Sequence, residues 1–242
     1  MLNKIRAATR QLGAANAAAY LINRALWRLG GFVRIYRYLL VAQPVRQAPL
    51  LTGRRGRSID VRPVEPGDPA LSAKWLTAQV LSYRFGQGSI CLGAFQNGAM
   101  IGWLWLTLGP YDEDEVRCRF MPRPAGQSAW DYDVFILPEY RTGPAFARLW
   151  DAANGYMRDR GIAWSFSRIS AFNPASLASH RRLGARHIGT ATYLCAGPVQ
   201  FMVSSLAPYL HLSFGPRAVP RMALPPPDHA DGVPAATATE AQ

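Results

Sequence analysis

The stretch NPASLASHRRLGARHIG, residues 173–189, decides how the rest of this 242-residue sequence is interpreted. It opens with Asn173, a residue type that favours the N-cap of a helix, and Gly184 stands where glycine favours a left-handed C-cap. A helix between them would carry Ser176 and His180 on one face, because these positions are four residues apart. The segment therefore predicts a short helix that presents a small residue and a polar ring together.

The spacing within this helix also carries a family resemblance. Counted from Asn173, a small residue falls at +3, a ring at +7, a basic residue at +9 and glycine at +11. This pattern resembles, without a gap, the last helix of the GNAT family of acyl-CoA N-acyltransferases, usually written N-x-x-A-x-x-x-Y-x-K-x-G-F. The resemblance runs from about Ser58 to Ser205 and is most specific over residues 131–189. It implies an α/β (α+β) fold, in which helices flank a mixed, mostly antiparallel central sheet.

The order of elements expected elsewhere agrees with that fold. Alternating or apolar runs predict strands within 58–68 and over 89–95, 99–108, 115–121, 129–137 and 164–170, followed by a hairpin of 188–195 and 199–205. Helices are predicted over 3–29, 69–84 and 142–160. Asn97 and Gly98 join two of the strands and predict a tight hairpin, because both residue types accept a positive φ.

Charge is distributed very unevenly along the chain. Residues 1–59 carry Lys4, ten arginines and no acidic residue, which gives +11 of the total net charge of +12. Three segments are expected: a basic, amphipathic helical extension with its linker over 1–57, a GNAT-like acyltransferase domain over 58–220, and a disordered Pro/Ala/Thr-rich tail over 221–242.

A basic, amphipathic extension needs a partner, and three are considered. An anionic membrane surface would take both its arginines and its apolar side chains. Alternatively, its apolar stripe packs on the catalytic domain or on a second copy in a homodimer. Nucleic acid is the third and least favoured partner, because no recognised nucleic-acid module accompanies the charge.

The expected location of the protein is the cytoplasm, with the inner face of the membrane as an alternative. Cysteines are few and widely separated, and they have neither the spacing of metal ligands nor that of a disulfide framework. No run of 18 uncharged apolar residues predicts a transmembrane helix, and arginines interrupt every apolar core that could form a signal peptide.

The resemblance implies where an acyl-CoA would bind. In the family, the central strand (here 131–137) pairs its backbone with the pantetheine arm and diverges from the next strand (here 164–170), and the loop into the following helix binds the pyrophosphate. Carried over by position, acetyl-CoA or another acyl-CoA is assigned to Val134, Phe135, Ile136, Arg141, Thr142, Gly143, Ala145, Phe146, Asn173 and Ser176. No metal is expected. The loop departs from the family pattern R-x-x-G-x-G/A, because Pro144 and Phe146 take the two glycine positions.

Three residues are assigned to catalysis. His180 stands where many GNAT enzymes have a tyrosine that protonates the departing thiolate, and an imidazolium could do the same. Asp131 and Asp133, two residues apart on one face of the predicted strand, are the candidate bases for an amine acceptor. The alternatives are that His180 is a surface or cap residue and that the two aspartates are structural.

The predicted function is N-acyl transfer, most simply N-acetyl transfer, from acyl-CoA to a primary amine by direct attack. The acidic run 112–115 would favour a cationic acceptor, although such a run is also typical of a solvated turn. The alternative is a catalytically degenerate protein of the same fold that acts as a binding or scaffold module, with its basic extension at a membrane.

Overall fold

The computed structural model describes residues 12–28, 30–71, 76–215 and 217–227. Its main feature is a nine-stranded sheet in which only the neighbours β7 and β8 run parallel. From one edge to the other the strands are β11 (Leu210–Phe214), β10 (Val199–Ser204), β9 (Arg186–Ala196), β1 (Val33–Pro44), β8 (Trp164–Ser170), β7 (Ser128–Ile136), β4 (Ala99–Thr107), β3 (Ile90–Gln96) and β2 (Asp60–Val64).

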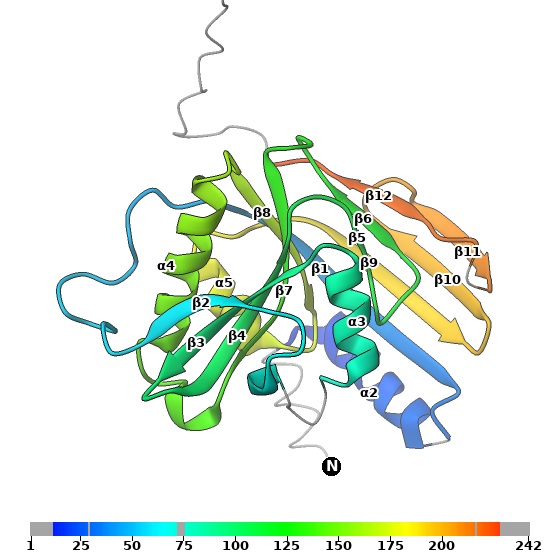
Figure 1. The fold of residues 1–242 in the computed structure, drawn as a ribbon. Helices are drawn as coiled ribbons and strands as arrows, with labels where there is room; N and C mark the ends of the chain where they lie inside the picture. Colours follow the sequence, from blue (N-terminus) through cyan, green and yellow to red (C-terminus); the bar gives the residue numbers. More distant parts are fainter. Residues whose placement is uncertain (1–11, 29, 72–75, 216, 228–242) are drawn as a thin grey trace, which may run out of the picture.

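Helices cover both faces of this sheet (Figure 1). One face packs against α4 (Ala145–Arg158) and α5 (Pro174–Arg182), and we call it the α4/α5 face. The opposite face, called the α3 face, packs against α3 (Ala78–Gly86) and a small sheet of β12 (Arg221–Leu224), β6 (Arg119–Pro122) and β5 (Tyr111–Asp112). The remaining helix, α2 (Ala14–Arg28), packs against β1. The predicted fold class, a mixed, mostly antiparallel sheet flanked by helices, is confirmed.

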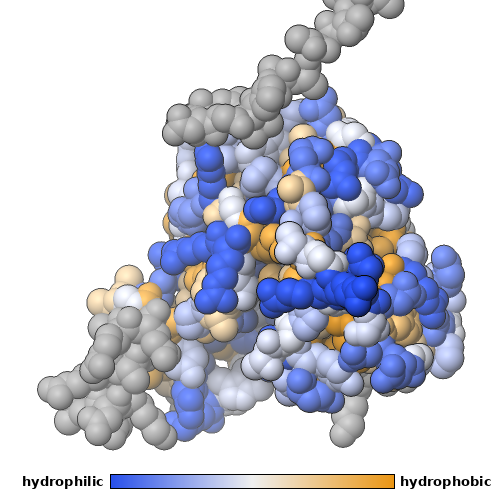
Figure 2. Space-filling model, turned by 90° about the vertical axis from the view of Figure 1, so that its left-hand side faces the viewer, coloured by the Kyte–Doolittle hydropathy of each residue, from blue (hydrophilic) through white to orange (hydrophobic). Residues whose placement is uncertain are grey.

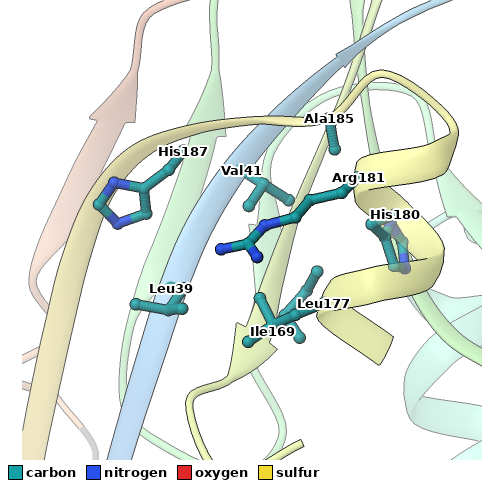
Figure 3. Close-up of a pocket in the computed structure, with 8 residues that line it drawn as sticks. All are labelled: Leu39, Val41, Ile169, Leu177, His180, Arg181, Ala185 and His187. Carbon is teal, nitrogen blue, oxygen red and sulfur yellow. The ribbon is translucent and has the colours of Figure 1, made fainter. Parts of the chain in front are cut away.

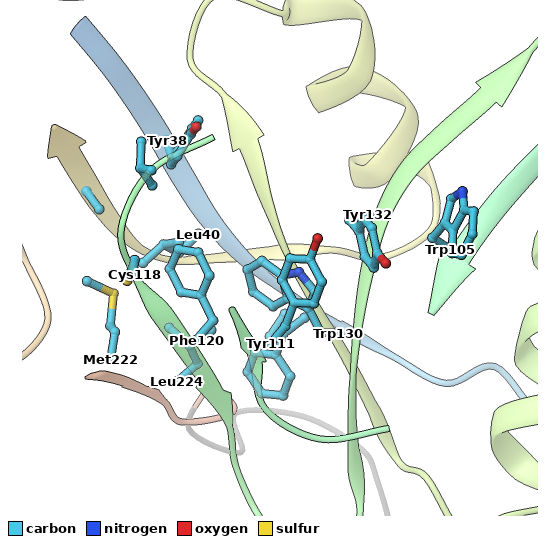
Figure 4. Packing of buried hydrophobic residues seen from close by; sticks show 14 of the residues in the cluster. Tyr38, Leu40, Trp105, Tyr111, Cys118, Phe120, Trp130, Tyr132, Met222 and Leu224 are labelled. Atoms are coloured by element: carbon cyan, nitrogen blue, oxygen red, sulfur yellow. The ribbon is translucent and has the colours of Figure 1, made fainter. Parts of the chain in front are cut away.

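Each face of the sheet has its own core. Large aromatic side chains fill the α3 face, where the rings of Phe120 and Trp130 lie 4.5 Å apart and those of Tyr111 and Tyr132 lie 4.4 Å apart (Figure 4). Aliphatic side chains dominate the α4/α5 face, around the fully buried Trp150 of α4. The alternation of β7 separates the two cores, because successive residues of a strand point to opposite faces.

Several local predictions are confirmed. Strand β8 has the predicted bounds, and Asn97 and Gly98 form the hairpin turn with φ of 51° and 79°. Asn173 caps α5, since its Oδ1 accepts a hydrogen bond from the Ser176 amide at 3.1 Å. Gly184 follows that helix with a φ of 93°. The sequence thus marks both ends of α5 correctly.

The segment 33–44 differs most from expectation. It was expected within a helical extension, but it forms β1, an interior strand that pairs with β8 on one side and β9 on the other. Its many β-branched and aromatic residues explain this, because such side chains suit a pleated, buried surface. Tyr38, Leu40 and Ala42 are buried in the α3-face core. The expected division at residues 57 and 58 therefore separates no structural units.

Other boundaries also change. Residues 221–224, expected in a disordered tail, form β12 and pair in parallel with β6, while residues 228–242 lie outside the described part of the chain. The predicted strand 115–121 shortens to β6, and the predicted helix 69–84 becomes a 3-10 turn (Pro69–Leu71) followed by α3. Of the predicted helix 3–29, the part before residue 12 lies outside the described residues.

The surface varies between the two edges of the sheet. The side of the molecule nearest β2 and α4 presents mainly hydrophilic side chains, with hydrophobic ones between them (Figure 2). None of the helices in the described residues combines the length and the hydropathy that crossing a bilayer requires.

Candidate active site

The site begins where β7 and β8 separate. These strands pair only through residues 128–130 and 164–166, although β7 continues to Ile136 and β8 to Ser170. The predicted divergence of the two strands is thus confirmed. Because each strand leads into its own helix, the N-termini of α4 and α5 both lie at the diverging end.

A β-bulge interrupts β7 within the diverging part. Trp105 pairs with Tyr132 and Trp103 with Phe135, so one residue of β4 lies opposite both Asp133 and Val134. Asp133 has a φ of 47°, which is rare for a residue other than glycine and typical of bulged or functional backbone. The bulge leaves backbone groups of β7 aimed away from the regular ladder.

The bulge also separates the two candidate aspartates. Asp133 contacts Arg84 of α3 and so lies on the α3 face. Asp131 has the opposite orientation to Trp130 and Tyr132, which fill the α3-face core, and therefore lies on the α4/α5 face. The expectation that both carboxylates share one face of the strand is wrong, because the extra residue reverses the alternation.

Asp131 is a buried carboxyl group at the closed end of the divergence. Only 1% of the residue is exposed, and its Oδ2 accepts a hydrogen bond from Ser165 Oγ at 2.6 Å. Its Oδ1 has no hydrogen-bond partner within the described residues. Burial, which disfavours the charged form, raises the pKa of Asp131 to about 7. This side chain can therefore exchange a proton near neutral pH.

Asp133 belongs to a network of ion pairs on the α3 face. Arg84 pairs with Asp133 and, at 3.4 Å, with Asp114. Trp103 Nε1 donates a further hydrogen bond to Asp133 Oδ2 at 3.4 Å. Burial and the neighbouring Glu113 raise the pKa of Asp114. Asp133 is thus a carboxylate held beside a fixed cation.

Three residues of the acidic run 112–115, namely Glu113, Asp114 and Glu115, belong to the same network, whereas Asp112 pairs with Arg119 at 3.0 Å. Arg168 of β8 contacts Glu113 at 2.6 Å and Glu115 at 2.7 Å, and Tyr38 donates a hydrogen bond to Glu115 at 2.9 Å. Glu113 is 7% exposed, so the run is more than a solvated turn. Together with Asp133 the network holds four carboxylates against the two guanidinium groups of Arg84 and Arg168. Its negative balance would attract a cation.

His180 lies in the interface between α4 and α5. Its ring meets the Trp150 ring edge-on, with 5.7 Å between the centroids, and 6% of the residue is exposed. Burial lowers the pKa of His180 to about 4, so the ring is neutral at pH 7. Neither expectation for His180 agrees with this environment. The residue is not on the surface, and its burial disfavours the imidazolium form that a general acid would need.

A cavity of about 330 Å³ lies between α5 and the strands β1, β8 and β9. In Figure 3, Arg181 extends from α5 across the apolar side chains of Leu39 and Ile169, with His187 on the far side. His180 also lines this cavity. Helix α5, which carries His180, therefore borders this cavity as well as the core around Trp150.

The loop before α4 is built by local hydrogen bonds. Arg141 Nε donates to the carbonyl of Ile136 at 3.0 Å, and the Gly143 amide donates to the carbonyl of Tyr140 at 3.1 Å. Thr142 lies between them. The Arg141 guanidinium is thus anchored to the last residue of β7.

The N-terminus of α4 is uncapped by any side chain and has no acidic residue in its first turn. Its first intrahelical bond runs from the Arg148 amide to the Pro144 carbonyl at 2.8 Å, so the amides of Ala145, Phe146 and Ala147 precede the hydrogen-bonded ladder. The Phe146 ring packs toward Trp150 with 6.4 Å between centroids. Phe146 takes a glycine position of the family pattern, and its ring lies beside Trp150 of the same helix.

The other residues assigned to the cofactor lie at the end of the sheet where β7 and β8 are no longer paired. Val134 belongs to the bulge of β7, Phe135 and Ile136 follow it, and the Phe135 ring lies 4.5 Å from that of Trp103. Asn173 and Ser176 form the N-terminal cap of α5. The structure thus groups the assigned residues around the diverging strands and the two helix starts.

Some residues of the site were not predicted. Gln43 of β1 pairs in register with Ser165, and its buried amide has no partner among the described side chains. Trp150 Nε1 and His180 Nδ1 are likewise buried without a partner in the described region. Since buried polar groups normally form hydrogen bonds, a ligand or water would complete them. The alternating serines of 164–170 were a sequence signal for part of this cluster, but nothing in the sequence pointed to Gln43.

Comparison with known proteins gives a likeness in fold. The sequence matches no model of a protein family and no curated protein sequence. Among solved structures, it is similar to a GNAT-family protein from Novosphingobium aromaticivorans DSM 12444, at 20% identity and a TM-score of 0.45, over 66% of this chain and 63% of that one. The match thus spans less than two thirds of that protein's length.

Two further solved structures are similar to the chain. One is a tandem GNAT protein from the clavulanic acid biosynthesis pathway, at 15% identity and a TM-score of 0.44, over 72% of this chain and 59% of that one. The other is a Trypanosoma brucei acetyltransferase, at 19% identity and a TM-score of 0.39, over 54% of this chain and 94% of that one. In its mixed sheet and flanking helices, the chain is similar in fold to GNAT acetyltransferases.

Proposed function

We propose that the protein is an N-acyltransferase that moves an acyl group, most simply acetyl, from acyl-CoA to a primary amine. The observation that carries the proposal is that β7 separates from β8 after residues 128–130. In the separated part, a bulge in β7 places Asp131 and Asp133 on opposite faces of the sheet. The slot would take the pantetheine arm, with the amine approaching from the α3 face.

Each part of the acyl-CoA would meet a matching feature. Val134, Phe135 and Ile136 lie beyond the last residues through which β7 pairs with β8, and this part of the strand would bind the pantetheine arm. The first-turn amides of α4, with the positive end of the helix dipole, suit the pyrophosphate. Backbone N–H groups near the bulge would polarise the thioester carbonyl. Positioning of two reactants in this slot would supply much of the rate.

The two aspartates would divide the proton transfers. Asp133, on the α3 face, accepts a proton from the attacking ammonium or amine. Nitrogen then bonds to the carbonyl carbon and the carbon–sulfur bond breaks. Asp131, on the α4/α5 face with its pKa raised to about 7, donates a proton to the leaving thiolate. His180, initially the candidate acid, is assigned a positioning role as a neutral ring beside Trp150.

Charge on the α3 face supports an amine as the acceptor. Four carboxylates surround Arg84 and Arg168 there, so a cationic acceptor would be drawn to this side of the bulge. A free ammonium group must lose a proton before it attacks, which gives Asp133 its role.

Calorimetry with acetyl-CoA, followed by an assay of thiol release with a panel of amines, tests the proposal. Binding in the micromolar range with amine-dependent thiol release is expected. Absence of acetyl-CoA binding at high micromolar concentration would count against an enzyme. Binding without turnover for any amine would favour the second candidate below.

The second candidate is a non-catalytic binding module of the same fold. Pro144 favours it, because it stands at a glycine position of the family loop and has no N–H to offer a phosphate. Protection of the α4 start by CoA, measured by hydrogen exchange, separates the two candidates when combined with the thiol assay.

A further inference from the structure

Far from the transfer site, one sheet face is exposed and apolar. We call it the β9–β11 patch; its members and their exposures are Leu194 (43%), Phe201 (40%), Val203 (45%), Leu210 (64%), Leu212 (49%) and Phe214 (67%). Phe201 pairs with Leu194 on one side and with Leu212 on the other, and Val203 pairs with Leu210. Paired residues point to the same face, so these side chains form one continuous surface.

The patch continues onto the start of β1. Phe214 pairs with Val199 beside the turn between β9 and β10, and Val33 pairs with Ala196 at the same end. Phe32 precedes Val33, is 69% exposed, and lies against Gly197 of that turn. Trp27 of α2 is 62% exposed, and the centre of its ring lies 4.6 Å from the guanidinium carbon of Arg34. Exposed aromatic rings and arginines thus extend the patch.

The elements that form the patch carry charges of one sign. Residues 1–59 and 160–227, which supply α2, β1, α5 and β8 through β12, contain eighteen basic residues and no acidic one. Residues 60–159 contain nine basic and twelve acidic residues. These elements therefore carry no acidic side chain of their own. The acidic residues Glu113 and Glu115 reach this half of the sheet only on the α3 face, where they pair with Arg168 of β8. The patch lies on the opposite face, because Tyr193 and Met202, the neighbours of Leu194 and Phe201 along their strands, are buried in the α3-face core.

We propose that the β9–β11 patch, with Trp27, Phe32 and the arginines of α2, binds the surface of an anionic lipid bilayer. A contiguous apolar surface of this kind marks an interaction site. Aromatic rings beside arginines suit the boundary between head groups and acyl chains of acidic lipids. A second copy would bring together two faces whose own strands and helix carry only basic side chains, which disfavours a dimer through this face. The proposal is independent of the acyl-transfer site.

Binding of the full chain to vesicles tests the proposal. Vesicles of phosphatidylcholine alone are compared with vesicles that also contain phosphatidylglycerol, at low and high salt. The apolar part is probed by the double variant L212S/F214S, and its matched control is Leu108→Ser, an exposed leucine in the other half of the sheet. The charged part is probed by R24Q/R28Q, with Arg62→Gln as its control.

The wild type is expected to bind only the anionic vesicles and to be released by salt. L212S/F214S should weaken this binding by at least about ten-fold, because two large apolar side chains lose their burial. R24Q/R28Q should weaken it by about five-fold for each arginine. Both controls should bind like the wild type. Thermal unfolding of every variant shows that the fold is retained.

Three results would overturn the proposal. One is the absence of binding to anionic vesicles, and another is equal binding by L212S/F214S and the wild type. The third is a wild-type protein that is dimeric in light scattering and does not bind vesicles, together with a monomeric L212S/F214S variant. This result would assign the patch to a second copy of the chain.

Discussion

Ser165, which pairs with Ala129 where β7 and β8 are still joined, donates a hydrogen bond of 2.6 Å from its Oγ to Oδ2 of Asp131, the first residue of β7 beyond that pairing. The bond favours the ionised carboxyl, while complete burial favours the protonated form more strongly, and the pKa of Asp131 is raised to about 7. A proton donor and acceptor for neutral pH is thus fixed at the point where the two strands begin to diverge.

Replacing Asp131 with Asn should lower kcat by about 100-fold at pH 7, because the leaving thiolate loses its proton donor. The wild-type kcat should fall as the pH rises above about 7, where the acid ionises. This alkaline limb should be absent in the variant. Ser165→Ala provides a finer check: its hydrogen bond lowers the pKa of Asp131, so its loss should move the limb to higher pH. An unchanged pH profile in both variants would remove Asp131 from catalysis.

Asp131 should also make stability depend on pH. Its pKa is higher in the folded chain than the ordinary value near 4, so its contribution is fully present below that value and is lost as the pH rises through about 7. Compared with D131N, the wild type should therefore lose about 3 kcal/mol of unfolding free energy between pH 5 and pH 8. Denaturant unfolding of both proteins at these two pH values measures the difference. A constant difference would contradict the assigned burial of the carboxyl.

Asp133→Asn should lower kcat by about 100-fold at neutral pH, since the ammonium acceptor loses its base. The defect should shrink at a pH above the acceptor's own pKa, because the amine is then already free. Asp114→Asn is the matched control: it also removes a carboxylate partner of Arg84, but not the proposed base. If the two variants behave alike at every pH, Asp133 acts only through the ion pair.

His180→Phe should leave kcat within about three-fold of wild type, because a ring whose pKa is lowered to about 4 is neutral at pH 7 and lacks the imidazolium proton that a general acid would donate. Phenylalanine keeps the apolar contact with Trp150, so the unfolding free energy should change by less than about 1.5 kcal/mol. Steady-state kinetics and denaturant unfolding check both statements. A loss of 100-fold in kcat with intact stability would restore His180 as the acid.

The sequence predicted the fold class and the ends of several elements well, for physical reasons. Elements with local signals were found: Asn173 and Gly184 mark the ends of α5, and Asn97-Gly98 marks a hairpin. The assigned cofactor residues follow directly from the order of β7, α4, β8 and α5. These residues lie together because β7 and β8 are parallel and each leads into a helix, α4 or α5, at the same end.

The rest depended on long-range pairing that no local pattern reveals. Residues 33–44 became β1 because β8 and β9 lie on either side of it, more than a hundred residues later in the chain. The bulge at Asp133 reversed the predicted orientation of one aspartate, and it is set by the register with β4. Likewise, the neutral state of His180 follows from burial between two helices. Tertiary context overrode the local pattern at each of these positions.

The start of α4 gives a direct test of cofactor binding. Ala147→Pro removes one of the three amides that precede the hydrogen-bonded ladder, and proline is tolerated in the first turn of a helix. Affinity for CoA in calorimetry should fall by about ten-fold, the usual effect of losing a hydrogen bond to a charged group. Ala147→Ser keeps the amide and should bind like the wild type, while both variants keep the wild-type unfolding temperature to within a few degrees. If the proline variant binds CoA as tightly as the serine variant, the phosphate lies elsewhere and the assignment of Ala145 and Phe146 fails with it.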